Sequence, residues 1–199
     1  INLLYDIGRA LAGVFDVDAI GRTVVDRAMA VIRAEGGLFV RLDGDPPVRY
    51  RTGDVPDAIV EQLAPGGSLL GRAVAAPVTI MKPLLVVRVQ TDGQTFGLLA
   101  LAGKRDGSAF TAGDGRLLQA LGEQAATAIH TERLVRELRE SERIRSEFEI
   151  ARQVQRSLLP SESPRVLGVD ITATCQPSGH VGGDYFDFFS LHDGRFGLI

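Results

Sequence analysis

The strongest strand pattern in the sequence lies in residues 83–104, which read "PLLVVRVQTDGQTFGLLALAGK". The segments 83–90 and 95–104 are both mainly apolar, and the Thr-Asp-Gly-Gln run between them contains Asp92 and Gly93. Both residues tolerate the positive φ that a tight hairpin turn needs. We therefore predict two antiparallel strands joined by a turn at Asp92 and Gly93.

The residues before this hairpin contain further helix and strand patterns. Apolar side chains recur at spacings of three and four in 1–15 and again in 18–32, which predicts two amphipathic helices. Strand-like segments follow at 37–43 and 47–53. Residues 68–80 mix Gly, Ala and Pro with apolar side chains, and we expect a short helix there with irregular connections around a pocket.

A long helix is predicted after the hairpin, because no proline interrupts residues 111–159 and Ala, Glu, Arg and Leu are abundant there. Thr111 and Asp114 have the T-x-x-D spacing of a capping box at its start. Apolar and small side chains at three-four spacing form a narrow seam, made of Leu117, Leu121, Ala125, Ala128, Val135, Leu138, Ile144, Phe148, Ala151, Gln155 and Leu158. Glu and Arg cover the other faces, which favours a parallel coiled coil between two copies of the chain. The alternative is a solvated helix that folds back on its own domain.

The last part of the chain predicts a small, incomplete sheet. Alternating side chains indicate a strand at 169–175, a second strand is expected at 185–191, and a third starts at 195–199 after a turn. Three strands without a covering layer make no independent core. We therefore expect both ends of the sequence to be cut from a longer protein, with the rest of this sheet beyond Ile199.

Composition and charge limit the possible partners. The chain has 199 residues, a net charge of −3 and scattered Lys and Arg, so we expect no nucleic-acid partner. Cys175 is the only cysteine, which excludes an internal disulfide and fits a reducing, cytoplasmic location. We see neither a membrane-spanning apolar run nor a signal peptide.

Asp184 is the candidate metal ligand. Gly182 and Gly183 precede it and let the backbone bend, so that the carboxylate can project into a cleft for a hard ion such as Mg²⁺ or Mn²⁺. In a regular strand Asp187 would point to the opposite face. On its own, the Gly-Gly-Asp run is better explained as a turn at the start of a strand, and the metal-ligand interpretation depends on the resemblance given next.

Residues 151–199 resemble the opening of the SpoIIE-like branch of the metal-dependent (PPM) serine/threonine protein phosphatases. The resemblance rests on "A-R-x-x-Q-x-x-L-L-P" at 151–160, on "CQPSGHVGGDYFDF" at 175–188 and on "L-x-D-G-R" at 191–195. It implies that Asp184 binds one ion of a Mn²⁺ or Mg²⁺ pair, and that the substrate is a phosphoprotein such as an anti-sigma-factor antagonist. The next family motif, Gly-Asp-Val-x-Gly-Lys-Gly, is absent, so no complete catalytic site is expected in these residues.

Residues 1–130 resemble a GAF domain, with PAS as a related alternative. The resemblance rests on "LLYDIGRALAGVFDVDAI" near the start, on the hairpin and on "FTAGDGRLLQALGEQAATAI" at 110–129. It implies a pocket lined by residues near 60–90 for a small-molecule effector whose identity stays unknown. The absence of cysteine before residue 131 excludes a thioether-linked bilin, and we expect His130 to be a solvated or seam residue, not a haem ligand.

These predictions combine into a three-part, α+β organisation. A GAF sensor with an antiparallel sheet and flanking helices occupies 1–130, a helical coiled-coil linker 131–160, and an N-terminal fragment of a phosphatase domain 161–199. The predicted protein is a cytoplasmic homodimer that forms the regulatory part of a phosphatase. The alternative is a GAF module without enzymatic activity, which binds a small molecule or dimerises.

Overall fold

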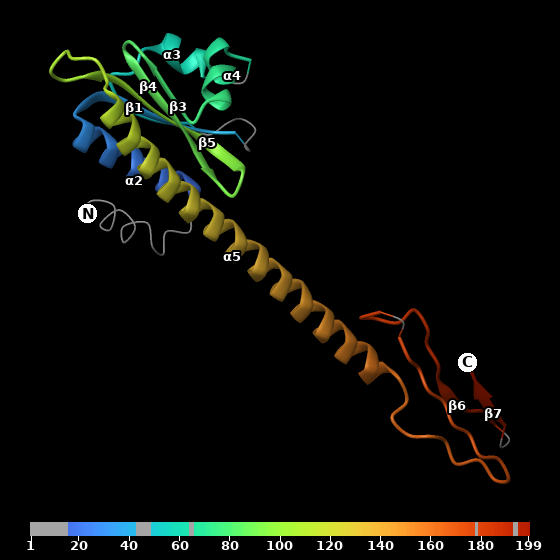
Figure 1. Ribbon diagram of the computed structural model, residues 1–199. Helices are drawn as coiled ribbons and strands as arrows, with labels where there is room; N and C mark the ends of the chain where they lie inside the picture. Colours follow the sequence, from blue (N-terminus) through green and yellow to red (C-terminus); the bar gives the residue numbers. More distant parts are fainter. Residues whose placement is uncertain (1–15, 43–48, 64–65, 178, 193–194) are drawn as a thin grey trace. The chain divides into compact units, whose positions relative to one another are not determined.

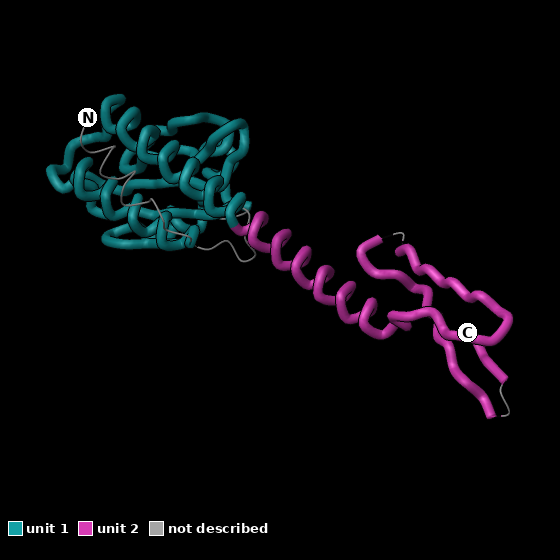
Figure 2. Tube along the Cα trace, turned by 90° about the horizontal axis from the view of Figure 1, so that it is seen from below, with its two compact units in different colours: residues 1–135 teal, residues 136–199 magenta. Residues whose placement is uncertain are grey.

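The computed structural model describes residues 16–42, 49–63, 66–177, 179–192 and 195–199. The helix predicted within residues 1–15 therefore lies outside the described residues. The chain divides into two compact units, Ile1–Val135 and Arg136–Ile199 (Figure 2), and each is described by itself below.

The first unit is built on a five-stranded antiparallel sheet with the strand order β2-β1-β5-β4-β3 (Figure 1). Its strands are β1 (Ala34–Arg41), β2 (Arg49–Gly53), β3 (Val78–Met81), β4 (Leu84–Thr91) and β5 (Gln94–Lys104). The helices are α2 (Val17–Ile32), α3 (Asp57–Gln62), α4 (Ser68–Ala75) and α5 (Ala112–Leu158), the last of which continues into the second unit. This arrangement confirms the predicted α+β fold with an antiparallel sheet and flanking helices.

The predicted hairpin forms the centre of this sheet. Asp92 has a φ of 49° and Gly93 a φ of 77°, and Thr91 pairs with Gln94 across the turn. Both strands of the hairpin are apolar on both sides because helices cover both faces of the sheet. The sequence therefore shows a continuous apolar run here instead of strict alternation.

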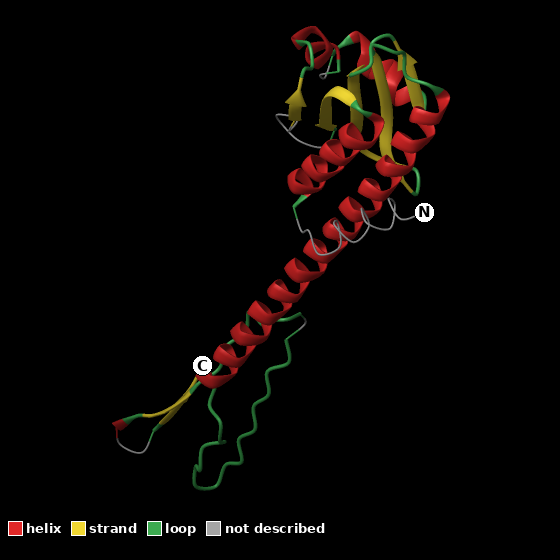
Figure 3. Cartoon of the chain, turned by 90° about the vertical axis from the view of Figure 1, so that its left-hand side faces the viewer, coloured by secondary structure: helices red, strands yellow, loops and turns green. Residues whose placement is uncertain are grey.

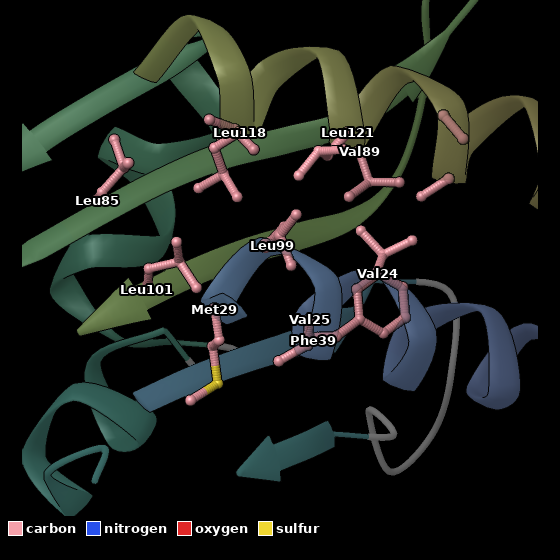
Figure 4. Packing of buried hydrophobic residues seen from close by; sticks show 14 of the residues in the cluster. Val24, Val25, Met29, Phe39, Leu85, Val89, Leu99, Leu101, Leu118 and Leu121 are labelled. Carbon is pink, nitrogen blue, oxygen red and sulfur yellow. The ribbon is translucent and has the colours of Figure 1, made fainter. Parts of the chain in front are cut away.

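Helices α2 and α5 cover one face of the sheet, and α3 and α4 cover the other (Figure 1). On the first face, Leu99 and Leu101 of β5 pack with Val24 of α2 and Leu118 and Leu121 of α5 (Figure 4). The opposite face has its own cluster, which contains Leu38, Val40, Leu63, Ala73, Leu84, Val86, Leu98 and Ala100. Alternate residues of each strand thus belong to two separate cores.

Helix α5 has 47 residues and confirms the long helix expected between residues 111 and 159. Its buried residues extend from Gly115 to Glu132, whereas later side chains such as Leu138 and Leu158 are exposed. None of the helices in the described part of the chain is long and apolar enough to span a lipid bilayer.

The second unit contains one antiparallel hairpin, formed by β6 (Phe188–Ser190) and β7 (Phe196–Leu198) (Figure 3). These strands are shorter forms of the two predicted at 185–191 and 195–199. The strand predicted at 169–175 is wrong: the segment is irregular, and only an isolated bridge joins Val166 to Val169. Alternation of side chains is present, but no strand among the described residues pairs with this segment and accepts its backbone hydrogen bonds.

Candidate functional site

Asp184 lies in irregular backbone just before β6, and its side chain is exposed. Its carbonyl oxygen accepts a weak hydrogen bond of 3.9 Å from the half-buried thiol of Cys175. The carboxylate itself has no hydrogen bond or ion pair within the described residues, so its oxygens are available to a cation. This segment does not belong to a strand, so the predicted opposition of Asp184 and Asp187 across a regular strand does not apply.

The neighbouring Asp187 carboxylate is already engaged. It accepts a 2.9 Å hydrogen bond from the hydroxyl of Tyr185 and a 2.7 Å hydrogen bond from the backbone N–H of Phe188. The hydrogen bond to Asp187 raises the pKa of Tyr185, because it stabilises the protonated hydroxyl. Asp187 is therefore a structural acceptor, and Asp184 is the free carboxylate of this segment.

Gly182 is held by the side chain of Gln155, near the C-terminus of α5. The amide nitrogen Nε2 of Gln155 donates to the carbonyl oxygen of Gly182, and the N–H of Gly182 donates to Oε1 of Gln155 at 2.9 Å. One side-chain amide thus satisfies both backbone groups of one glycine. The A-R-x-x-Q and Gly-Gly-Asp segments, 27 residues apart in sequence at these two positions, are in direct contact.

A second contact joins the same helix to the residues just before Gly182. The rings of Phe148 and His180 stack with their centroids 4.9 Å apart and an interplanar angle of 17°. Phe148 and Gln155 are seven residues apart, about two helical turns, and therefore lie on one face of α5. Both residues were predicted as members of the dimer seam, and the structure places both against the residues 180–182 of their own chain.

A metal centre at Asp184 would need further ligands, and the described residues do not gather them around it. The described residues contain no group of three or more His, Cys, Asp or Glu side chains that could hold a metal ion. A free carboxylate next to two glycines fits one ligand position for Mg²⁺ or Mn²⁺, which prefer oxygen donors. Any complete centre needs further oxygen ligands besides those described.

In the first unit, the predicted pocket region near 60–90 contributes to both faces of the sheet: Leu84 and Val86 of β4 lie on the side of α3 and α4, and Leu85 on the side of α2 and α5. Leu63, Ala73 and Val86 are buried on the α3/α4 side and belong to one hydrophobic cluster.

Arg88 of β4 is a half-buried charged residue on the α3/α4 side. Its guanidinium donates a 3.1 Å hydrogen bond to the carbonyl oxygen of Val74, and its Nε is buried with no acceptor within the described residues. The α3/α4 side of the sheet is therefore mainly apolar, with the Arg88 guanidinium among its side chains.

A separate cavity of about 240 Å³ lies beside the β3–β4 turn and the connection from β5 to α5. Its polar lining includes Glu35 and Lys104, and its apolar lining includes Pro83 and Phe110. Lys104 is already paired with Asp114, at 3.2 Å. Residues 80–83 also line it, so part of this cavity lies within the range 60–90 where the pocket was predicted, whereas the walls near Glu35 and Lys104 were not predicted.

His130 differs from the prediction of a solvated or seam residue. It is half-buried, its ring centroid lies 6.0 Å from that of Phe96 on β5, and its Nδ1 is a buried atom with no hydrogen-bond partner within the described residues. The helical spacing alone placed His130 on α5 but did not show that this side of the helix faces β5.

Comparison with known proteins agrees with the architecture of the first unit. The GAF domain of a putative sensor histidine kinase from Pseudomonas syringae pv. tomato has 22% sequence identity and a TM-score of 0.53, over 70% of this chain and 90% of that chain. The GAF domain of the potassium sensor histidine kinase KdpD from Escherichia coli has 16% identity and a TM-score of 0.52, over 68% of this chain and 96% of that chain. A structure of residues 122 to 287 of a methyl-accepting chemotaxis protein has 15% identity and a TM-score of 0.53, over 65% of this chain and 98% of that chain.

No curated protein matches the chain. A sequence model of the GAF domain matches residues 16–131, which is more than half of the 199 residues. The matched region contains the whole five-stranded sheet and every buried residue of α5 except Glu132. The chain therefore belongs to the GAF domain family.

Proposed function

We propose that this chain is the regulatory part of a metal-dependent serine/threonine protein phosphatase of the SpoIIE-like PPM type. Its GAF domain is the sensory part, α5 is the linker, and the residues after Pro160 are the opening of the phosphatase domain. The support comes from the motifs in residues 151–195 and from their arrangement in space.

The contact between Gln155 and Gly182 is the observation that carries this proposal. The resemblance rests on motifs that are separate in the sequence. Segments that did not belong to one domain would not be expected to form specific contacts with each other. Here the glutamine of one motif makes two hydrogen bonds to the first glycine of the next. This supports the view that residues 151–184 are parts of one structural unit with Asp184 at its exposed end.

In this proposal Asp184 binds one of two Mn²⁺ or Mg²⁺ ions, and the other acidic ligands come from residues outside these 199. Such an ion pair activates a water molecule and neutralises charge on the phosphoryl oxygens. The substrate is a Ser- or Thr-phosphorylated protein, of which an anti-sigma-factor antagonist is the type that the resemblance suggests. In this proposal the chain supplies one metal ligand, Asp184, and the described residues do not form a complete catalytic site.

Helix α5 provides the route for regulation in this proposal. It runs without a break from the GAF core at Leu118 to Gln155, so a small-molecule effector or a dimer contact could change the pairing or rotation of the helix. Replacing Ser141 and Arg145 by Leu in the complete gene product should strengthen helix pairing between two copies and change turnover. Coupling between the GAF domain and the phosphatase part needs evidence beyond the continuity of the helix. If the variant shows unchanged pairing and unchanged turnover, this route is rejected.

A GAF module without enzymatic activity is the second candidate. The exposed apolar side chains along α5, among them Leu134, Leu138 and Leu158, favour a role in dimerisation that needs no phosphatase. In that case the residues after Pro160 would serve as a surface or connection, and Asp184 would have no metal to bind.

Phosphate release by the complete gene product distinguishes the two candidates. The substrate is a serine-phosphorylated anti-sigma-factor antagonist, assayed with and without Mn²⁺. We expect Mn²⁺-dependent release that falls by about 100-fold or more in Asp184→Asn, because a ligand of the metal pair is lost. The matched control is Asp170→Asn, another exposed aspartate of the second unit, which should retain activity. Absence of Mn²⁺-dependent release, or full activity of Asp184→Asn, would favour the non-enzymatic module.

A further inference from the structure

The surroundings of Gly182 and Gly183, the two glycines before Asp184, do not require glycine at either position. A Cβ added to Gly182 would lie 3.4 Å from Cγ of Pro177, which is close to ordinary contact, and a Cβ at Gly183 would meet nothing within 4 Å. Neither glycine is among the described residues with a positive φ. Their shared property here is conformational freedom, and glycine loses more of it than any other residue when it becomes ordered.

Something must therefore hold this backbone if Asp184 is to have a defined position. The structure offers three contacts for the segment that ends at Asp184. Phe148 stacks on His180, Gln155 binds both backbone groups of Gly182, and the thiol of Cys175 donates to the carbonyl oxygen of Asp184. The Gln155 contact is the most specific of the three, because it uses a donor and an acceptor in one fixed geometry.

The Gln155 amide acts as a short substitute for a neighbouring strand. A backbone N–H and C=O of one residue would otherwise bind two groups of an adjacent strand, and here one side chain binds both. Asp184 follows two residues later, within roughly 7 Å of Gly182 along the chain. A change in the position of Gln155 on α5 therefore changes where the Asp184 carboxylate can lie.

We propose that Gln155 is a positioning residue for the Asp184 carboxylate. This inference rests on the proposed function, because it assigns Gln155 a role only if Asp184 binds a metal. It goes beyond the proposed function by naming the contact that connects α5 to Asp184. The side-chain amide of Gln155 fixes the backbone of Gly182 and thereby the direction of the Asp184 side chain. Loss of this amide should weaken metal binding without removing a metal ligand.

The first test measures the bond itself, in the 199-residue chain and without metal. Amide hydrogen exchange of Gly182, followed by NMR, is compared in the wild type, Gln155→Met and Gln155→Glu. Methionine preserves the size and helix propensity of glutamine but makes neither hydrogen bond, whereas glutamate keeps the acceptor for the Gly182 N–H. We expect exchange about fivefold faster or more in Gln155→Met and near-normal exchange in Gln155→Glu.

The control for this test is Gln153→Met. Gln153 is exposed and two positions away on the same helix, so the change has the same effect on helix composition without touching Gly182. The rate of amide hydrogen exchange at Gly182 in Gln153→Met should equal that in the wild type. Equal exchange in Gln155→Met and the wild type would overturn the proposal, since Gly182 would then not be held by Gln155.

The second test measures the consequence in the complete gene product, by Mn²⁺ titration. We expect Gln155→Met to bind Mn²⁺ about tenfold more weakly than the wild type, which is the lower end of the range for residues that orient a metal ligand. Gln155→Glu should retain part of the wild-type affinity. Faster exchange at Gly182 with unchanged Mn²⁺ affinity would overturn the positioning role. If the wild type binds no Mn²⁺, the proposed function fails together with this role, whereas the exchange measurement still shows whether the bond exists.

Discussion

Thr111 and Asp114 close the start of α5 with hydrogen bonds in both directions. The hydroxyl of Thr111 accepts a 3.2 Å hydrogen bond from the N–H of Asp114, and Oδ2 of Asp114 accepts a 2.7 Å hydrogen bond from the N–H of Thr111. Lys104, at the end of β5, adds a 3.2 Å ion pair to the same oxygen. The first turn of α5 is therefore held by the Thr111–Asp114 hydrogen bonds and by the ion pair with Lys104 of the sheet.

Removal of the cap should destabilise the GAF domain measurably. We expect Thr111→Ala to lower the free energy of unfolding by about 1 kcal/mol, the usual cost of losing an N-terminal cap. Thr131→Ala is the matched control, because the Thr131 hydroxyl only donates to the carbonyl of Thr127 inside the helix, at 2.9 Å. Urea denaturation provides both values. Equal losses in the two variants would show that the cap has no special role.

Acid should remove part of this stabilisation. Burial opposes ionisation of Asp114, but hydrogen bonds from Thr111 and the contact with Lys104 outweigh it and lower the pKa below the ordinary value of 3.8. A carboxylate with a lowered pKa in the folded state stabilises the protein above its unfolded-state pKa, and this contribution is lost as the pH falls through the folded-state pKa.

Comparison with Asp114→Asn isolates this effect. The difference in free energy of unfolding between the wild type and the variant should be constant near neutral pH and should shrink as the pH falls below about 3.8. Urea denaturation at a series of pH values measures it. A difference that is independent of pH, or that grows in acid, would contradict this account of the cap.

Two helical glycines should respond to alanine in opposite directions. A Cβ at Gly21 of α2 would overlap with Cδ1 of the buried Phe39, whereas a Cβ at Gly71 of α4 would meet nothing within 4 Å. Gly21→Ala should therefore cost about 1–3 kcal/mol through overpacking, and Gly71→Ala should stabilise by about 0.5–1 kcal/mol through helix propensity. Thermal and urea denaturation measure both changes. A Gly21→Ala variant as stable as the wild type, or more stable, would show that packing between α2 and β1 does not require glycine.

Helix pairing can be tested at Leu138, which is 64% exposed on α5. If two copies pair along the predicted seam, Leu138→Lys should weaken the dimer by tenfold or more, because an apolar side chain at the interface is replaced by a charge. Leu167→Lys alters a leucine that is fully exposed and outside the predicted seam, and it should leave the dimer intact. Native mass spectrometry over a range of protein concentrations gives the dissociation constants. A wild type that stays monomeric at all concentrations would contradict the predicted homodimer.

Elements with strong local signals could be predicted from the sequence. The turn at Asp92 and Gly93 needs a particular φ, and α5 has both a capping box and favourable composition, so local chemistry was sufficient for each. Strand β3 and helix α3 were missed because they contain four and six residues and show too little periodicity. Their conformation depends on the neighbouring β4 and on packing against the sheet.

The candidate site was predictable only in part. Motif resemblance singled out Asp184, but three-four spacing placed Gln155 in a dimer seam, although its amide binds Gly182. Helical spacing shows which residues share a face and does not show what covers that face. The strand predicted at 169–175 was wrong for a related reason: alternation is a property of the segment, whereas pairing depends on a neighbour.

Mn²⁺ titration of the complete gene product, comparing the wild type with Asp184→Asn and Asp170→Asn, tests the central claim most directly. The claim is that the exposed carboxylate after Gly183 belongs to a metal centre of a phosphatase. We expect the wild type and Asp170→Asn to bind Mn²⁺ with the same affinity, and Asp184→Asn to bind at least about tenfold more weakly. Equal affinity of Asp184→Asn and the wild type, or no Mn²⁺ binding by the wild type, would contradict it.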